Sequence, residues 1–240
     1  MNPRPSVDET LDTFLDGSLR ILQKKKGYRF SVDAVLLHRF ARIKRDEKVI
    51  DLGTGCGILP LLLSQTTRAR SFVGVEIQQG LEELARKNVV LNHLQSRVSI
   101  LHQDFRELRQ TFPAGVFDVV LSNPPYRKCR TGRVNPSDEK AVARHEIKGS
   151  LEEMISIASY LLPPRGRCYL IYSAARVVDL LVILRRHRLE PKRLQFVYPG
   201  VGEGAAFVLS ESVKESGVES IIMEPLILSA PDSVAQRTTP

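Results

Sequence analysis

The sequence predicts an α/β fold, a doubly wound and mostly parallel seven-stranded sheet that ends in an antiparallel C-terminal hairpin. Two observations lead to this prediction. From residue 48 to residue 187, short runs rich in β-branched residues alternate with helical runs, which is the pattern of right-handed β–α–β crossovers. The last third of the chain then has strand-like runs with no helical run between them, which favours antiparallel neighbours.

The expected elements follow one another with short turns between them. A helical run over 31–41, which Ser31 or Asp33 can cap, comes before the first strand. Runs with strand character span 48–52, 71–77, 97–104, 117–121, 167–173, 193–199, 205–212 and 221–229. The expected helices span 58–65, 80–94, 150–162 and 175–187.

The chain is expected to form one domain over residues 1–229, because no linker or internal repeat interrupts the alternation. Residues 15–47 form an N-terminal segment ahead of the first strand. Residues 230–240 are polar and rich in small side chains, and we expect a flexible C-terminal tail there.

Composition excludes several classes of protein. The chain is 42% hydrophobic and 26% charged, its longest apolar runs are too short to span a membrane, and its polar N-terminus lacks a signal-peptide core. Its three cysteines have no CxxC spacing, which argues against a zinc site or a disulfide scaffold. We therefore expect a cytoplasmic monomer that uses no metal and no membrane.

Basic residues exceed acidic ones, 35 against 27, which gives a formal net charge of +8. The excess is clustered in 20–29, 127–133, 185–188 and 192–193. Clustered cations are what a surface that binds a polyanion needs. Taken alone, such runs also fit an ordinary solvated surface, so charge favours nucleic acid only slightly.

A glycine turn follows the first strand, where doubly wound sheets bind nucleotide-like ligands. In "DLGTGCGI" the glycines are Gly53, Gly55 and Gly57, preceded by Asp51. A dinucleotide fingerprint would have glycine at position 58, which is Ile58, and a phosphate loop would have a lysine. The turn therefore permits close backbone approach without a strong phosphate signature.

Two further acids close the next expected strands. Glu76 lies about 20 residues after the loop, where a carboxylate can accept both ribose hydroxyls, and Asp104 could accept from an adenine amino group. Each acid alone also fits a strand end or a helix cap. Together they favour a nucleoside cofactor without a diphosphate, for which S-adenosylmethionine is the obvious candidate.

With these features, "DLGTGCG", the acid of "GVEI" and "SNPPY" (residues 122–126), the chain resembles the class I S-adenosylmethionine-dependent methyltransferases. The resemblance implies a Rossmann-like fold, cofactor contacts from Asp51, the three glycines, Glu76, Asp104 and Asn123, and a catalytic loop of Asn123, Pro124 and Tyr126. In that loop the Asn123 side-chain oxygen and the Pro124 carbonyl can each accept one N–H of a planar amino group. This favours pyramidalisation of the nitrogen and stabilises its developing positive charge.

A wider resemblance concerns the methyl acceptor. The stretches "GYRFSVDAVLLHRF", "GRVNPSDEKAVARHEI" and "EPLILS" are similar to the bacterial tRNA1(Val) adenine N6-methyltransferase family over roughly residues 15–229. This implies N6-methylation of an adenine in RNA, in a tRNA anticodon loop, with Tyr126 stacking the base. The implied substrate-binding residues are Pro125, Tyr126, Arg127, Lys128 and Arg133, although Arg127 stands where an aromatic residue is common in that family.

Other acceptors remain open. A glutamine N5-methyltransferase that acts on peptide release factors shares Asn-Pro-Pro-Tyr, but such enzymes usually have a longer N-terminal domain than the 47 residues present here. A DNA adenine methyltransferase would need room for a target-recognition domain. The alternative without catalysis is an RNA-binding module on a methyltransferase fold, which the intact Asp51, Glu76, Asp104 and Asn123 disfavour.

Overall fold

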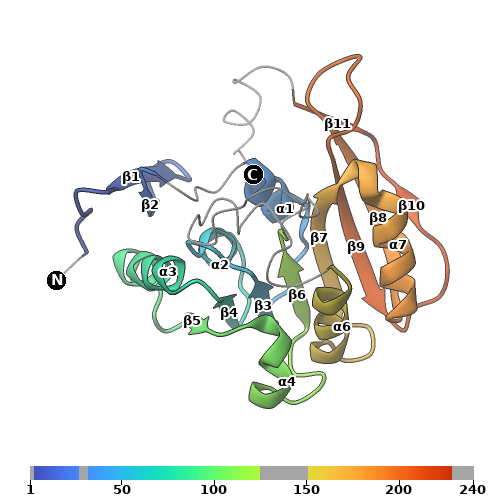
Figure 1. Cartoon of the computed structure of the whole chain (residues 1–240), viewed down its shortest axis with the longest axis horizontal. Coiled ribbons are helices and arrows are strands. Elements are labelled where there is room, and N and C mark those ends of the chain that lie inside the picture. Colours follow the sequence, from blue (N-terminus) through green and yellow to red (C-terminus); the bar gives the residue numbers. More distant parts are fainter. Residues whose placement is uncertain (1–2, 27–31, 125–150, 229–240) are drawn as a thin grey trace, which may run out of the picture.

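A nine-stranded sheet, with two strands more than the seven predicted, forms the centre of the protein, in a computed structural model that describes residues 3–26, 32–124 and 151–228. The order of its path is β10-β8-β9-β7-β6-β3-β4-β5, with β11 paired to β8 (Figure 1). The strands are β3 (Lys48–Leu52), β4 (Ser71–Glu76), β5 (Val98–His102), β6 (Val119–Ser122), β7 (Arg167–Ser173), β8 (Leu189–Tyr198), β9 (Phe207–Lys214), β10 (Ile221–Ile222) and β11 (Leu226–Ile227).

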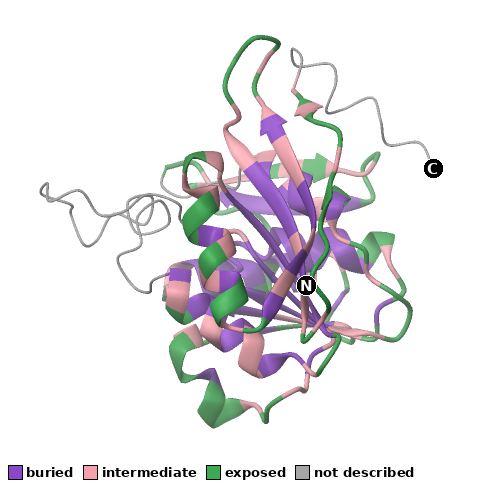
Figure 2. Cartoon of the chain, turned by 90° about the vertical axis from the view of Figure 1, so that its right-hand side faces the viewer, coloured by how far each residue is buried: buried purple, intermediate pink, exposed green. Residues whose placement is uncertain are grey.

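Helices cover both faces of the sheet, which confirms the doubly wound prediction. They are α1 (Val32–Phe40), α2 (Ile58–Thr66), α3 (Gln79–Leu91), α4 (Leu108–Thr111), α6 (Leu151–Leu161) and α7 (Val177–Arg186), with short turns η1 (Phe105–Glu107) and η2 (Ala174–Arg176). Along β3, Val49 packs into one buried cluster with α1, α2 and α3, and Ile50 packs into a second cluster with α6 and α7. Buried positions therefore follow the strands on both sides of the sheet (Figure 2).

The strand directions agree with the predicted class. Strands β5, β4, β3, β6 and β7 are parallel, and β9 pairs antiparallel with both β7 and β8. The expected last strand over 221–229 is instead two strands of two residues, β10 and β11, both parallel to β8. Pro225 lies between them, and proline has no N–H to continue a ladder.

An N-terminal hairpin, which the sequence reading did not anticipate, lies beside α3 (Figure 1). Its strands β1 (Glu9–Phe14) and β2 (Leu19–Lys24) pair antiparallel around a turn in which Asp16 and Gly17 both have positive φ. An Asp-Gly pair between two such runs is a hairpin signal. It was obscured because β1 has a polar composition, ETLDTF.

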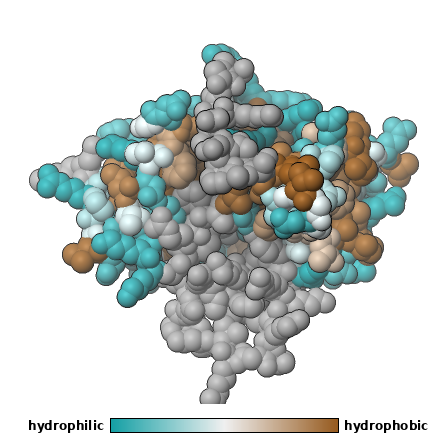
Figure 3. Space-filling view, turned by 90° about the horizontal axis from the view of Figure 1, so that it is seen from above, coloured by the Kyte–Doolittle hydropathy of each residue, from teal (hydrophilic) through white to brown (hydrophobic). Residues whose placement is uncertain are grey.

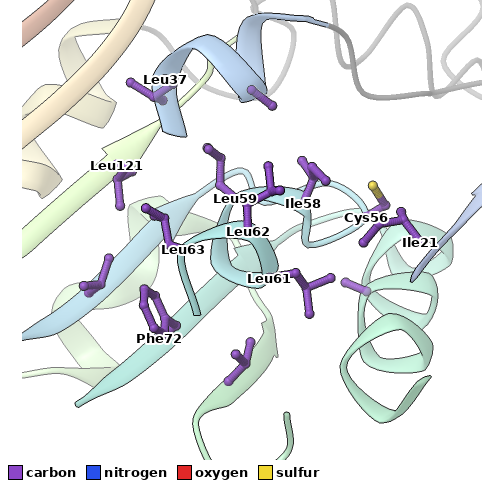
Figure 4. Close-up of a cluster of buried hydrophobic side chains, with 14 of the residues drawn as sticks. Ile21, Leu37, Cys56, Ile58, Leu59, Leu61, Leu62, Leu63, Phe72 and Leu121 are labelled. Carbon is purple, nitrogen blue, oxygen red and sulfur yellow. The ribbon is translucent and has the colours of Figure 1, made fainter. Parts of the chain in front are cut away.

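The end of α1 is bound to the sheet, which places the N-terminal segment over one face. Arg193 donates from Nη2 to the carbonyl of Phe40 at 3.0 Å, and the Tyr169 hydroxyl donates to the carbonyl of Arg42 at 3.1 Å. Below α1, the apolar side chains of α2 fill the space to the sheet (Figure 4). The loop that precedes α2 is therefore held by a packed helix.

The described surface is mixed in character. Seen from above, hydrophilic side chains alternate with hydrophobic ones, and hydrophobic side chains gather on the right-hand side (Figure 3). Large exposed hydrophobic side chains at that end of the sheet lie on α7, β10 and β11, namely Val178, Val182, Ile221, Ile222 and Ile227. Among the described helices, none combines the length and the hydropathy that a membrane crossing requires.

Candidate functional site

Four predicted site residues lie along one edge of the sheet, at or just after the carboxyl ends of neighbouring strands. Asp51 is in β3 and Glu76 ends β4, while Asp104 and Asn123 follow β5 and β6. The four strands are adjacent in the order β5-β4-β3-β6, so three gaps of about 4.8 Å separate the outer two strands by roughly 14 Å. The structure therefore brings these residues to one elongated site.

The glycine turn between β3 and α2 is folded back onto the end of β4. The N–H groups of Gly53 and Thr54 both donate to the carbonyl of Val75 at 2.9 Å. Gly53, Gly55 and Gly57 have φ values of 78°, 59° and 84°, in a backbone region that residues other than glycine rarely adopt. The backbone conformation of the turn thus requires glycine at these three positions. A Cβ at Gly53 would meet nothing within 4 Å, so the space beside this residue is open.

Glu76 ties this turn to the start of α3. Its side chain is 5% exposed, its Oε2 accepts from the Gly55 N–H, and its Oε1 accepts from the Gln78 N–H, both at 2.9 Å. Each carboxylate oxygen has two lone pairs and can accept more than one hydrogen bond. The carboxylate is held in one position by two backbone donors.

Asp51 is the most buried acid of the site, with 2% of its surface exposed. Burial raises the pKa of its carboxyl to about 7; the neighbouring Thr54 hydroxyl opposes this rise, and the negative charge of Glu76 adds to it. The two side chains are neighbours, but within the part of the chain that the structure describes, the buried atoms Asp51 Oδ1 and Thr54 Oγ1 reach no partner with full hydrogen-bond geometry. Buried polar atoms of this kind point to a polar ligand at the turn.

Asp104 lies at the same edge, but its carboxylate is engaged locally. It caps η1 by accepting from the Arg106 N–H at 3.0 Å, and it forms an ion pair with the Arg106 guanidinium. A contact between Asp104 and an adenine amino group would therefore compete with Arg106, and it stays a prediction.

The segment after β6 begins next to the glycine turn. The buried Ser122 hydroxyl donates to the carbonyl of Leu52 at 2.7 Å, which fixes the end of β6 against the end of β3. Asn123 is half-buried and Pro124 is buried. The other predicted residues of this loop, Pro125, Tyr126, Arg127, Lys128 and Arg133, lie outside the described residues.

Several residues that support the site were missed by sequence reasoning. Ser122 precedes the Asn-Pro-Pro-Tyr motif, and its hydroxyl contact could not be read from a strand pattern. Gly74 lies in β4 against Thr54, where a Cβ would be 2.9 Å from the threonine side chain. The fully buried Asn88 of α3 donates to the carbonyl of Cys56. The sequence feature that could have pointed to it is the pair of asparagines, Asn88 and Asn92, spaced by one helical turn.

The residues present suit a nucleoside cofactor more than a metal. Across the described ranges, no group of three or more His, Cys, Asp or Glu side chains is placed to hold a metal ion. The open glycine turn, the fixed Glu76 carboxylate and the buried Asp51 and Thr54 oxygens fit a ligand that offers hydroxyl groups and positive charge.

Comparison with known proteins agrees with this geometry. The family model described as "Methyltransferase small domain" matches residues 31–177. A tRNA1(Val) (adenine(37)-N6)-methyltransferase of Porphyromonas gingivalis is 33% identical over 189 residues, which is 76% of this chain and 73% of that protein. Its counterpart of the same name from a Flavobacteriaceae bacterium is 29% identical and covers 72% of this chain and 78% of its own length.

The fold is also similar to that of solved methyltransferases. A crystal structure of a predicted O-methyltransferase from Agrobacterium tumefaciens superposes with a TM-score of 0.67 at 24% identity, over 84% of this chain and 89% of that one. At that identity the likeness supports the fold alone, whereas the family match covers more than half of the chain. The chain therefore belongs to the methyltransferase small domain family and is an S-adenosylmethionine-dependent N-methyltransferase.

Proposed function

We propose that the protein methylates the N6 amino group of an adenine in RNA, in the anticodon loop of a tRNA. The observation that supports this most is the position of Asn123 and Pro124, directly after β6 and beside the glycine turn. An amino-group clamp must lie next to the methyl donor, and β6 is the strand adjacent to β3. The named relatives favour adenine as the acceptor and tRNA as the substrate.

The cofactor site is proposed to involve Asp51, the glycine turn, Glu76, Asp104 and Asn123. Glu76 would accept the ribose hydroxyls, because its carboxylate is already oriented by Gly55 and Gln78. The buried Asp51 would face the positively charged part of the ligand, because an ionised carboxylate favours a nearby cation. S-adenosylmethionine, when bound, supplies a methyl group on a sulfonium ion that a nitrogen lone pair can attack.

The proposed work of the catalytic loop is to make an amino nitrogen nucleophilic. The lone pair of an adenine amino group is delocalised into the ring, so the free base is a poor nucleophile. The Asn123 side-chain oxygen and the Pro124 carbonyl would each accept one N–H, which favours a pyramidal nitrogen whose lone pair is localised and directed at the methyl group. The same acceptors stabilise the positive charge that grows on nitrogen before a proton leaves it. Tyr126 would stack the flipped base.

The charge distribution fits a polyanionic acceptor on one side of the molecule. Lys24, Lys25 and Lys26 end β2 and the segment after it. By contrast, the run at 185–188 lies at the opposite edge of the sheet, before β8. There Arg185, Arg186 and Arg188 form ion pairs with acidic residues, namely Glu190, Glu152 and Glu215. In the lysine run, Lys25 donates to the carbonyl of Val7, an uncharged partner, at 2.7 Å. We take the lysine run as the candidate for contacts to RNA phosphates.

The experiment that tests this function compares acceptors directly. Purified protein with labelled S-adenosylmethionine is incubated with unmodified tRNA and with a peptide release factor in parallel, and the products are digested and analysed by mass spectrometry. N6-methyladenosine from tRNA alone is the expected result. Methyl transfer only to a glutamine of the release factor would show that the N5-methyltransferase alternative is correct.

A further inference from the structure

Two asparagines, Asn88 of α3 and Asn92 directly after its last residue, hold the N-terminal hairpin through its backbone. The Asn92 side chain accepts from the Arg20 N–H at 2.9 Å and donates to the Arg20 carbonyl at 2.7 Å. The Asn88 side chain does the same with Leu22, at 2.7 Å and 3.0 Å. Each amide group therefore pairs with one strand residue as a neighbouring strand would.

The spacing explains why this arrangement works. Four residues of an α-helix advance about 6 Å, and two residues of a strand advance about 6.6 Å, so Asn88 and Asn92 stay in register with Leu22 and Arg20. The pairing satisfies the edge of β2 that faces away from β1. Because an unpaired buried N–H or carbonyl is costly, these contacts determine where the hairpin lies on α3.

The two asparagines differ in their remaining contact. Asn92 donates a second time to the carbonyl of Asn88, within its own helix, at 2.8 Å. Asn88 instead donates to the carbonyl of Cys56 at 3.0 Å, in the turn of Gly53, Gly55 and Gly57. Ile21 of β2 and Cys56 also belong to one buried cluster (Figure 4). Asn88 therefore forms hydrogen bonds to both the hairpin and the glycine turn.

We propose that Asn88 is a positioning residue that couples the N-terminal hairpin to the cofactor loop. Its single amide plane is fixed by three bonds, one from Leu22, one to Leu22 and one to Cys56, so a shift of the turn is transmitted to β2. A ligand that orders the turn should then also order the hairpin that ends in the lysine run Lys24–Lys26. The inference goes beyond the proposed function, because it does not depend on which acceptor is methylated.

The first test needs no variant. Amide hydrogen exchange of Arg20 and Leu22 is measured in the wild-type protein with and without S-adenosylhomocysteine, whose binding is measured separately by calorimetry. Coupling of ordinary size slows exchange of both amides by about fivefold or more when the ligand is bound. Unchanged exchange in a protein that does bind the ligand overturns the coupling. Failure of the ligand to bind at all would contradict both the assigned cofactor and the coupling, whereas failure to methylate RNA would affect the proposed acceptor alone.

The second test compares Asn88→Ala with the matched Asn92→Ala. Both changes remove two hydrogen bonds to β2, and both should speed exchange in the hairpin, but only Asn88→Ala removes the bond to Cys56. Asn88→Ala should therefore weaken S-adenosylhomocysteine binding by about fivefold or more and abolish the ligand-dependent protection of Arg20. Asn92→Ala should keep the affinity within about twofold. Equal affinities in the two variants would reduce Asn88 to a structural tether.

Discussion

The Gly55 N–H donates a hydrogen bond of 2.9 Å to Oε2 of Glu76, across the gap between the ends of β3 and β4. Gly55 has a positive φ, so this donor is directed by a conformation that glycine adopts at little cost. The other carboxylate oxygen accepts from Gln78, at the start of α3. The acid assigned to the ribose and the turn assigned to the rest of the cofactor are therefore one hydrogen-bonded unit.

Replacing Glu76 should consequently weaken binding of the cofactor in two ways. Glu76→Ala removes the proposed ribose acceptor and also releases Gly55 and Gln78. Because hydrogen bonds to a charged group contribute about 1.5–3 kcal/mol each, calorimetry should show S-adenosylmethionine affinity reduced by about tenfold or more. Glu83→Ala is the matched control, since Glu83 is exposed on α3 and contacts Gln79. Wild-type affinity in Glu76→Ala, or binding of NADH in place of S-adenosylmethionine, would contradict the assigned cofactor site.

Gly74 should be unable to accept even a methyl side chain. In Gly74→Ala the new Cβ would lie 2.9 Å from the Thr54 side chain and 3.0 Å from Ile100 Cδ1. Overpacking of this kind typically destabilises a protein by about 1–3 kcal/mol, and here it pushes on the cofactor turn. Urea unfolding should show the loss of stability, and calorimetry should show a lower affinity for the cofactor. Gly204→Ala, where a Cβ would meet nothing within 4 Å, should change neither measurement.

The pKa of Asp51 predicts how stability depends on pH. Burial raises this pKa from 3.8 to about 7, so between these values the folded protein holds a proton that the unfolded chain has released. The stabilising contribution of Asp51 is therefore complete below about pH 4 and is lost as pH rises towards 7, by up to about 1.4 kcal/mol per pH unit. Asp51→Asn should remove this term. Its unfolding free energy, measured in urea between about pH 5 and 7, should fall less steeply than that of the wild type. Parallel pH profiles would show that Asp51 titrates normally.

Much of the sheet could be predicted because its strands are buried on both faces. The run 119–121 is wholly apolar and buried, and stretches with the helical period of about 3.6 residues separate the strands. The glycines of the turn and the acids at the strand ends could be placed for the same reason, since the carboxyl ends of parallel strands meet at one edge.

The hairpin and its attachment could not be predicted, because they depend on contacts between distant residues. The sequence of β1, ETLDTF, is mostly polar and shows no clear alternation of apolar and polar residues. β2 is stabilised by asparagines that lie 66 and 72 residues later in the chain. A pattern within one segment does not reveal such a partner. The same holds for Ser122, whose hydroxyl bonds to Leu52, and for Asp104, whose carboxylate is bound by Arg106.

The lysine run Lys24–Lys26 should contribute to RNA binding through phosphate contacts. Changing all three to alanine should weaken binding of tRNA and reduce the slope of log affinity against log salt by about 2, because fewer counterions are released. The change of Arg185, Arg186 and Arg188 to alanine is the matched control, with the same loss of charge at the opposite edge of the sheet. Filter binding over a range of salt measures both slopes. An equal effect in the two triple variants would indicate a general charge effect instead of a surface for RNA.

The amino-group clamp is tested most directly at Asn123. In the proposed transition state its side-chain oxygen accepts from a nitrogen that gains positive charge, so the interaction strengthens as the methyl group transfers. At saturating S-adenosylmethionine, so that any loss of cofactor affinity is excluded, Asn123→Ala should lower the single-turnover rate with unmodified tRNA by roughly two to three orders of magnitude. Tyr126→Ala should instead weaken acceptor binding by about 1–3 kcal/mol through lost stacking, with a smaller effect on the chemical step at saturating tRNA. A wild-type rate in Asn123→Ala would exclude the clamp, because alanine cannot replace the oxygen that is proposed to accept from the amino group.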